Sequence, residues 1–256
     1  MKILASDFDG TLNRGGVSDY DKSAISAWQE AGNLFGIVTG RDFNGIWYEV
    51  VKHNLNVDFL GAYNGGVIYD GNGENIICET STSPEMAGDL LQYLRDQNAN
   101  YAELCVLKKK YQVFPERDDR SMLTGEILKS LEFVTMINTY IDPFERAVSC
   151  VAEIAERFGR DFNPLLNGCC IDIPPAGMNK GVGVQKYADA VIKSEKYAGQ
   201  NIVFGERDIL TVGDQLNDLD MIIPFFGCAV ENAVDDVKSA AKMIYKSVGD
   251  LIYDNI

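Results

Sequence analysis

Two aspartates close to the start of the sequence, Asp7 and Asp9, directly follow the apolar run 3–5 and precede Gly10. Side chains two residues apart on a strand point to the same side, so the two carboxylates should share one small volume. Like charges this close repel unless a cation or a shared proton compensates, and hard cations such as Mg²⁺ prefer carboxylate oxygens. A solvated surface turn is the alternative, because Asp, Gly and Thr are common turn formers. The place behind an apolar run favours a metal site at the end of a buried strand.

Two further clusters hold residue types that commonly bind phosphate. Thr39 and Gly40 follow the apolar run 34–38, where a hydroxyl can donate to a phosphate oxygen and a glycine lets backbone N–H groups approach it. Lys180 opens a predicted helix, and lysine is a usual point-charge partner of phosphate. Taken singly, each has an ordinary explanation, which is a strand-to-helix turn for the first and a solvated lysine for the second.

A fourth cluster brings two more carboxylates, because Asp214 and Asp218 follow the apolar run 209–212. The carboxyl ends of the strands of an open α/β sheet are where ligands bind. Acids, hydroxyls and glycines gathered at several strand ends are hard to explain by turn statistics alone. Together the clusters predict one site that holds a metal ion and a phosphate.

The composition excludes several classes of protein. The chain has 256 residues, of which 46% are hydrophobic and 24% are charged, which is typical of a globular protein. Its 38 acidic and 23 basic residues give a net charge of −15, which argues against nucleic-acid binding and against docking on an anionic membrane. No apolar run is long enough to span a membrane, and an acid at position 7 interrupts any signal-peptide core. We therefore expect a cytoplasmic protein whose mature chain begins at Met1.

The histidine and cysteine content narrows the chemistry further. His53 is the only histidine, so mechanisms that need a histidine base are nearly excluded. It ends a predicted helix, where a cation is favourable. The six cysteines show no Cys-x-x-Cys spacing, so we expect no structural zinc site and mostly small buried thiols in a reducing compartment.

The two flanks of the chain supply alternating strands and helices that could position these clusters. The predicted strands are 3–7, 34–39, 57–62, 209–212 and 228–230, and the predicted helices are about 18–31, 43–52, 180–192, 219–223 and 234–243. Residues 64–77 are predicted to form a β-hairpin, and 193–208 an extra strand or a surface loop. This alternation indicates an α/β fold built on a doubly wound, Rossmann-like parallel sheet.

The middle of the chain has a different pattern. Helices are predicted at 84–96 and 144–158 among β-rich segments at 101–107, 111–114, 133–141 and 170–173, with three lysines, 108–110, at a hairpin turn. The apolar period of 3.6 residues across 144–158 is typical of an amphipathic helix. We therefore expect a core formed by 1–82 and 176–256, with 83–175 inserted into it as an α+β module.

In this order, the four clusters resemble the four sequence motifs of the haloacid dehalogenase superfamily. The residues that carry the resemblance are Asp7-Phe8-Asp9-Gly10-Thr11-Leu12, Val38-Thr39-Gly40-Arg41, Asn179-Lys180-Gly181 and Gly213-Asp214 through to Asn217-Asp218. The insertion resembles the cap of the Cof-type, subclass IIB phosphatases. The segment 193–208 is longer than is usual in that family, and we assign it no function.

The resemblance implies a role for each motif residue. Asp7 would be the nucleophile that forms an aspartyl-phosphate, and Asp9 would serve first as general acid and then as base. The residues so implied for phosphate or substrate binding are Thr39, Gly40, Lys180, Asn217 and Asn64. Those implied for Mg²⁺ are Asp7, the backbone carbonyl of Asp9, Asp214 and, in support, Asp218.

The function expected from this resemblance is a magnesium-dependent phosphatase of small phosphorylated metabolites, with sugar phosphates favoured. The inserted module would be a cap that selects the substrate. Asp9 argues against a dehalogenase, which lacks it, and against an ion-pumping ATPase, which carries other residues in its place. Two alternatives remain, a phosphomannomutase-like transferase with the same carboxylate pair and a non-catalytic sensor of phosphorylated ligands. Sensors commonly lose the nucleophile or a metal carboxylate, and this chain keeps both.

Overall fold

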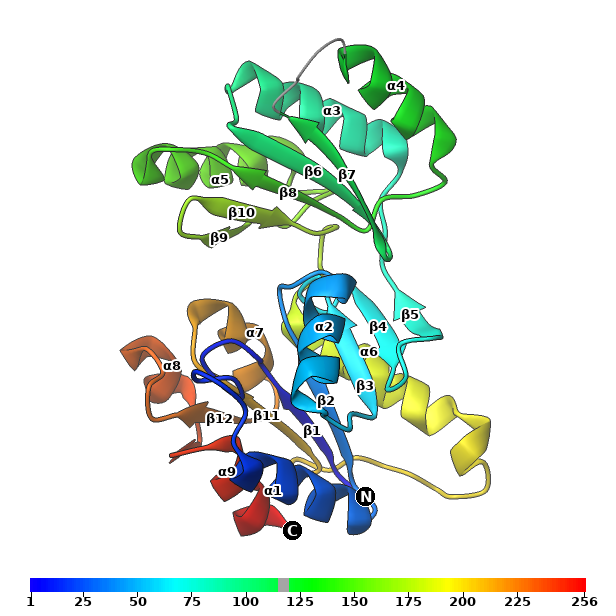
Figure 1. Ribbon diagram of the computed structural model, residues 1–256, viewed down its shortest axis with the longest axis vertical. Helices are drawn as coiled ribbons and strands as arrows, with labels where there is room; N and C mark the ends of the chain where they lie inside the picture. Colours follow the sequence, from blue (N-terminus) through cyan, green and yellow to red (C-terminus); the bar gives the residue numbers. More distant parts are fainter. Residues whose placement is uncertain (115–119) are drawn as a thin grey trace. The chain divides into compact units, whose positions relative to one another are not determined.

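The computed structural model describes residues 1–114 and 120–256, which divide into two compact units (Figure 1). The core unit comprises 1–78 and 179–256, and the inserted unit comprises 79–178. The sequence analysis set the two boundaries at 82/83 and 175/176. Residues near both boundaries are hydrogen-bonded within the inserted unit, since Thr82 pairs with Val134 and the Ala176 N–H donates to the Asp161 carbonyl at 2.9 Å.

The core unit is built on one sheet whose strand order is β13-β12-β11-β1-β2-β3-β4-β5. Its strands are β1 (Ile3–Ser6), β2 (Leu34–Val38), β3 (Phe59–Ala62), β4 (Val67–Asp70), β5 (Ile76–Glu79), β11 (Ile209–Gly213), β12 (Phe226–Val230) and β13 (Met243–Tyr245). The pairs from β13 through to β3 are parallel, and β4 runs antiparallel to β3. β1 and β11 are fully buried and mostly apolar, as expected for parallel strands covered on both faces.

The helices of the core unit cover both faces of this sheet. They are α1 (Asp19–Glu30), α2 (Phe43–His53), α6 (Lys180–Lys193), α7 (Leu219–Ile222), α8 (Asp235–Ala240) and α9 (Val248–Asn255). The crossovers β1-α1-β2 and β11-α7-β12 run in opposite directions across the sheet, so their right-handedness requires α1 and α7 to lie on opposite faces. α9 packs with α1, and α6 packs with α7. The doubly wound α/β fold predicted from the sequence is confirmed.

Local signals set where these helices begin and end. The side chain of Ser18 accepts a hydrogen bond from the Asp21 N–H at 3.0 Å and so caps α1. Asn179 caps α6 in the same way by accepting from the Val182 N–H at 2.9 Å. α2 ends at His53, and the next residue, Asn54, has a φ of +52°, the left-handed conformation that stops many helices. The cap at Asn179 makes Lys180 the first residue of α6.

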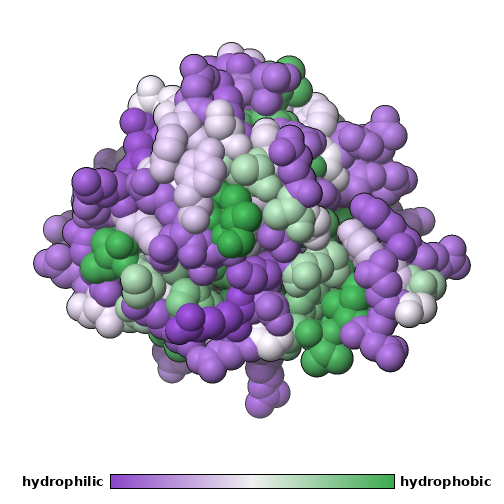
Figure 2. Space-filling view, turned by 90° about the horizontal axis from the view of Figure 1, so that it is seen from below, coloured by the Kyte–Doolittle hydropathy of each residue, from purple (hydrophilic) through white to green (hydrophobic). Residues whose placement is uncertain are grey.

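One face of the sheet packs against α6 through a cluster of buried apolar residues. Ile3 and Val38 come from the strands, and Val184 and Tyr187 from the helix. The rings of Tyr187 and Phe59 stack with their centroids 3.7 Å apart. On the face of the molecule drawn in Figure 2, by contrast, hydrophobic residues lie in small separate groups among hydrophilic ones.

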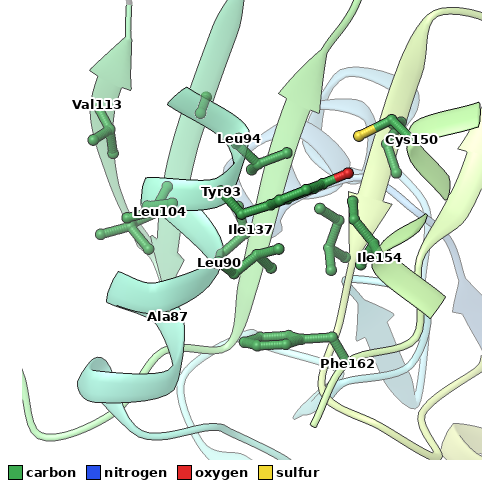
Figure 3. Packing of buried hydrophobic residues seen from close by; sticks show 14 of the residues in the cluster. Ala87, Leu90, Tyr93, Leu94, Leu104, Val113, Ile137, Cys150, Ile154 and Phe162 are labelled. Atoms are coloured by element: carbon green, nitrogen blue, oxygen red, sulfur yellow. The ribbon is translucent and has the colours of Figure 1, made fainter. Parts of the chain in front are cut away.

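The inserted unit contains a five-stranded antiparallel sheet in the order β7-β6-β8-β10-β9. Its strands are β6 (Tyr101–Val106), β7 (Lys109–Phe114), β8 (Met136–Tyr140), β9 (Leu165–Asn167) and β10 (Cys170–Ile173), and its helices are α3 (Pro84–Asp96), α4 (Arg120–Ser130) and α5 (Phe144–Phe158). Figure 3 shows Leu90 of α3, Ile137 of β8 and Ile154 of α5 meeting in a shared apolar interior. The inserted unit therefore has a core of its own.

Three details differ from the sequence-based expectations or refine them. Lys109 and Lys110 belong to β7 rather than to a turn, and Lys110 pairs with Glu103 at 2.9 Å. The helix predicted at 234–243 ends at Ala240, because Met243 begins β13 and pairs with Cys228. In the segment 193–208, Lys193 ends α6 and the other residues form a loop with one 3₁₀ turn at Glu195–Tyr197. Among the residues that the structure describes, no helix combines the length and apolar character that crossing a membrane requires.

Candidate active site

Three neighbouring parallel strands bring the predicted clusters to one edge of the core sheet. β1 lies between β2 and β11, with Ser6 in register with Ile37 and Val212. The loops that follow these strands start at the same edge, since the carboxyl ends of parallel strands coincide. The Asp7 N–H still donates to the Val212 carbonyl at 2.9 Å, so Asp7 is held by the sheet ladder itself.

A buried lysine joins two of the carboxylates at this edge. Lys180 Nζ lies 2.7 Å from Asp7 Oδ1 and 2.6 Å from Asp218 Oδ1. Asp7 is 5% exposed, Lys180 1% and Asp218 0%, so all three charges are removed from water. Buried charges are tolerated only when they are paired or bind a metal ion. The sequence placed these residues in one site, and the structure brings them into direct contact.

Asp214 completes a group of three buried carboxylates. Asp7, Asp214 and Asp218 each offer an oxygen within 4.8 Å of the others. Thr11 Oγ1 donates to Asp214 Oδ1 at 2.6 Å and fixes its orientation. Gly10, with a φ of +86°, leaves space for this carboxylate, because a Cβ there would stand 2.3 Å from Asp214 Oδ2. The loop after β1 is therefore shaped around the carboxylate that follows β11.

The charges of this group do not balance within the protein. Three carboxylates face one ammonium group, and burial together with the negative charges of Asp218 and Asp214 raises the pKa of Asp7 to about 7, against the opposing effect of Lys180. Burial alone would lower the pKa of Lys180, but the charges of Asp7 and Asp218 raise it above its ordinary value. A divalent cation would supply the missing positive charge, and an all-oxygen donor set suits Mg²⁺. The residues present therefore fit the ion.

Asp218 also organises the loop that follows β11. Its Oδ2 accepts hydrogen bonds from the N–H groups of Asp214 at 2.8 Å and Gln215 at 2.9 Å. These bonds hold the backbone at Asp214 while the other oxygen of Asp218 binds Lys180. One carboxylate thus positions both a candidate metal ligand and the candidate phosphate-binding lysine.

The predicted phosphate-binding threonine is buried in the loop after β2. Thr39 is 2% exposed, and its Oγ1 accepts a hydrogen bond from the Arg41 N–H at 3.2 Å, so its own hydroxyl hydrogen can donate to a ligand. The Asn64 N–H donates to the Thr39 carbonyl at 2.8 Å, and Asn64 is buried with a φ of +54°. The structure brings Thr39 and Asn64 together. Asn217 lies half-buried in the 3₁₀ turn Leu216–Asp218.

Asp9 is far more exposed than Asp7, Asp214 and Asp218. Its side chain is 50% exposed, and both of its oxygens accept hydrogen bonds from Arg41, at 2.6 Å from Nε and 2.7 Å from Nη2. Bonding to Asp9, which outweighs the opposing effect of burial, raises the pKa of Arg41 further above its ordinary value. The sequence analysis quoted Arg41 in its motif but gave it no role. Its place directly after Thr39 and Gly40 was the available signal.

One protein family matches the chain over nearly its whole length. Residues 4–250 match the family described as haloacid dehalogenase-like hydrolase. No match was found among curated proteins.

Solved structures similar to this chain share its complete fold. A haloacid dehalogenase-like hydrolase from B. subtilis has a TM-score of 0.80 at 19% identity and covers 100% of both chains. A HAD/COF-like hydrolase from Plasmodium vivax has a TM-score of 0.75 at 22% identity, covering 99% of this chain and 94% of the other. A protein from Bacteroides thetaiotaomicron, described among phosphatases of the haloalkanoate enzyme superfamily, has a TM-score of 0.76 at 19% identity, covering 99% and 93%. At these identities the likeness shows the fold.

Proposed function

The chain belongs to the haloacid dehalogenase-like hydrolases, and from this premise we propose that it is a Cof-type phosphatase of small phosphorylated metabolites. The observation that carries the proposal is the buried group of Asp7, Asp214 and Asp218 around Lys180. Family membership and the phosphatase description of one structural neighbour support it. We extend the proposal to sugar phosphates as substrates and to the inserted unit as the cap that selects among them, on the basis of the resemblance to cap-bearing phosphatases.

In the first half-reaction, Asp7 attacks the phosphorus atom of the substrate. Lys180 binds Asp7 Oδ1, which leaves Oδ2 as the attacking oxygen. A P–O bond to Oδ2 forms, the P–O bond to the leaving group breaks, and the carboxyl group of Asp9 gives its proton to the leaving oxygen. The products of this step are an alcohol and an aspartyl-phosphate.

In the second half-reaction, the Asp9 carboxylate takes a proton from water. The water oxygen attacks the phosphorus atom, the P–O bond to Asp7 breaks, and inorganic phosphate leaves. Throughout, the Thr39 hydroxyl, the Gly40 N–H and Lys180 hold the phosphoryl oxygens, with Asn64 and Asn217 as further contacts. Mg²⁺ held by Asp7, the backbone carbonyl of Asp9 and Asp214, with Asp218 in support, would neutralise negative charge on the phosphoryl group.

The experiment that tests this proposal is a phosphate-release assay on p-nitrophenyl phosphate and a panel of sugar phosphates. The wild-type protein with MgCl₂ should turn over, and Asp7→Asn should reduce release to background, because an amide cannot serve as the nucleophile. Addition of EDTA should also abolish release. Asp19→Asn, at an exposed position of α1, is the matched control and should behave as wild type.

Three outcomes would contradict the proposal. Equal rates in the wild type and Asp7→Asn would remove the nucleophile assignment. Turnover that requires a sugar bisphosphate activator would indicate a phosphomutase. Binding of phosphorylated ligands without any turnover would indicate a sensor.

A further inference from the structure

Arg41 and the half-exposed Asp9 form a bidentate ion pair. The guanidinium donates from Nε and Nη2 to the two oxygens of Asp9, which is the bidentate geometry that fixes both the position and the plane of a carboxylate. Asp9 is otherwise half exposed, and a half-exposed side chain without such a partner would be free to rotate.

Arg41 is itself held at its far end by Glu49. This glutamate of α2 is 8% exposed, and its Oε1 lies 3.5 Å from Arg41 Nη1. Lys52 Nζ at 3.0 Å and His53 Nε2 at 3.3 Å flank its other oxygen. The proposed reaction does not use Glu49, yet the fold buries its charge beside Arg41. A role in bracing the guanidinium accounts for that placement.

The backbone of Arg41 is fixed by the same loops that hold the phosphate-binding residues. Its N–H donates to Thr39 Oγ1 at 3.2 Å, and its carbonyl accepts from the Tyr63 N–H at 2.9 Å. Its guanidinium carbon lies 5.4 Å from the centre of the Phe8 ring. Arg41, which binds Asp9, is therefore held by its backbone, by the Phe8 ring beside its side chain and by Glu49 at its guanidinium.

We propose that Arg41, braced by Glu49, is the positioning residue that orients the Asp9 carboxyl group for proton transfer. The inference rests on the proposed phosphatase function and deepens it. A carboxylate has about four lone-pair sites, and Arg41 occupies two of them, which leaves sites for the transferred proton. In the first half-reaction that proton passes from Asp9 to the leaving oxygen as the P–O bond breaks. In the second, Asp9 receives a proton from the attacking water.

The test compares two substrates whose leaving groups differ in their need for a proton. p-Nitrophenolate is a weak base and departs with little protonation, whereas the phenolate of phenyl phosphate is a stronger base. Arg41→Gln should lower kcat for phenyl phosphate by roughly 10- to 100-fold, a part of the 10²–10⁴-fold that general acid–base catalysis contributes. KM should stay within about 2-fold of the wild-type value, because the substitution removes no contact that binds the substrate and the transition state equally.

With p-nitrophenyl phosphate, Arg41→Gln should give a different time course. The aspartyl-phosphate still forms quickly, but its hydrolysis needs the oriented Asp9. We expect a rapid burst of one p-nitrophenolate per enzyme, followed by slow turnover. Arg41→Lys should also turn over slowly, because a single ammonium group cannot reproduce the planar, bidentate contact of a guanidinium with both Asp9 oxygens. Glu49→Gln should show the same pattern in a weaker form.

Arg207→Gln is the matched control, since this exposed arginine lies just before β11, at the opposite end of the strand from the site. It should match wild type on both substrates. An unchanged kcat in Arg41→Gln, a raised KM alone, or an equal loss on both substrates without a burst would each overturn the positioning role. A wild-type protein that hydrolyses neither substrate would overturn the proposed function instead.

Discussion

Lys180 is the residue on which the electrostatics of the site depend. It is the first residue of α6, it is 1% exposed, and it stands between Asp7 and Asp218. Lysine at a helix start gains nothing from the helix dipole, so its place there is explained by the two carboxylates. Removing one partner of a buried ion pair costs far more than the pair itself contributes, because a bare charge remains in the interior.

We therefore expect Lys180→Met to lower the free energy of unfolding by about 3–5 kcal/mol in the presence of EDTA. Excess MgCl₂ should restore part of that loss, because a bound cation would replace the missing positive charge and stabilise the folded state. Urea unfolding under both conditions measures the effect. Lys193→Met, at an exposed position of the same helix, is the control and should change stability little. A loss that Mg²⁺ does not reduce would contradict the expectation.

Sequence pattern could single out the residues of the candidate site but not the contacts among them. The acids, the threonine and the lysine were found because each adjoins an apolar strand or opens a helix, which local pattern reveals. The pairing of Arg41 with Asp9 spans 32 residues and depends on the conformation of two loops. The fit of Gly10 around Asp214 likewise joins distant parts of the chain. Local spacing carries no information about either contact.

At the scale of elements, two glycines allow α6 to approach its neighbours. A Cβ on Gly181 would lie 1.9 Å from the Asp220 carbonyl oxygen, and one on Gly183 would lie 2.7 Å from the Cα of Gly65. Both neighbours are backbone and cannot rotate away. α6 therefore packs against α7 and against the loop after β3 at distances that only glycine permits.

This packing reverses the usual effect of replacing a helical glycine. Helix propensity alone predicts that Gly→Ala stabilises a helix by about 1 kcal/mol. We expect Gly125→Ala in α4, where nothing lies within 4 Å of the new Cβ, to follow that rule. Gly183→Ala should instead lower stability, since backbone must move. Chemical unfolding should show a higher free energy of unfolding for Gly125→Ala than for wild type and a lower one for Gly183→Ala. A Gly183→Ala variant more stable than wild type would contradict this expectation.

Sequence pattern predicted the long helices with correct bounds and missed a short strand. α3 and α5 have the predicted bounds, Pro84–Asp96 and Phe144–Phe158, because long amphipathic helices repeat their pattern over several turns. β13 was missed, since three partly exposed residues, Met243–Tyr245, contain no alternation to detect. It forms because β12 offers it a parallel edge, which is a tertiary cause.

At the scale of the whole molecule, each unit has its own apolar core. Leu90 lies in the core of the inserted unit and Ile68 in that of the core unit, both 0% exposed. The two tryptophans, Trp28 and Trp47, belong to the core unit. Tryptophan fluorescence therefore reports the core unit, whereas far-UV circular dichroism reports both.

We expect Leu90→Ala to destabilise the inserted unit by about 2–5 kcal/mol and to leave the tryptophan transition in urea unchanged. Ile68→Ala should shift the tryptophan transition. Both variants should alter the circular dichroism curve, at different denaturant concentrations. Identical shifts of both probes in both variants would mean that the protein unfolds as one cooperative unit.

The central pairing of β1 with β11 has a consequence for biosynthesis. Ile3 of β1 is in register with Ile209, the first residue of β11. The amino-terminal strand therefore cannot pair with β11 until the ribosome has synthesised residues more than 200 positions later. Residues 79–178 form a contiguous stretch and can fold as soon as they emerge. The insertion should thus mature during translation, and the surrounding sheet should close only near its end.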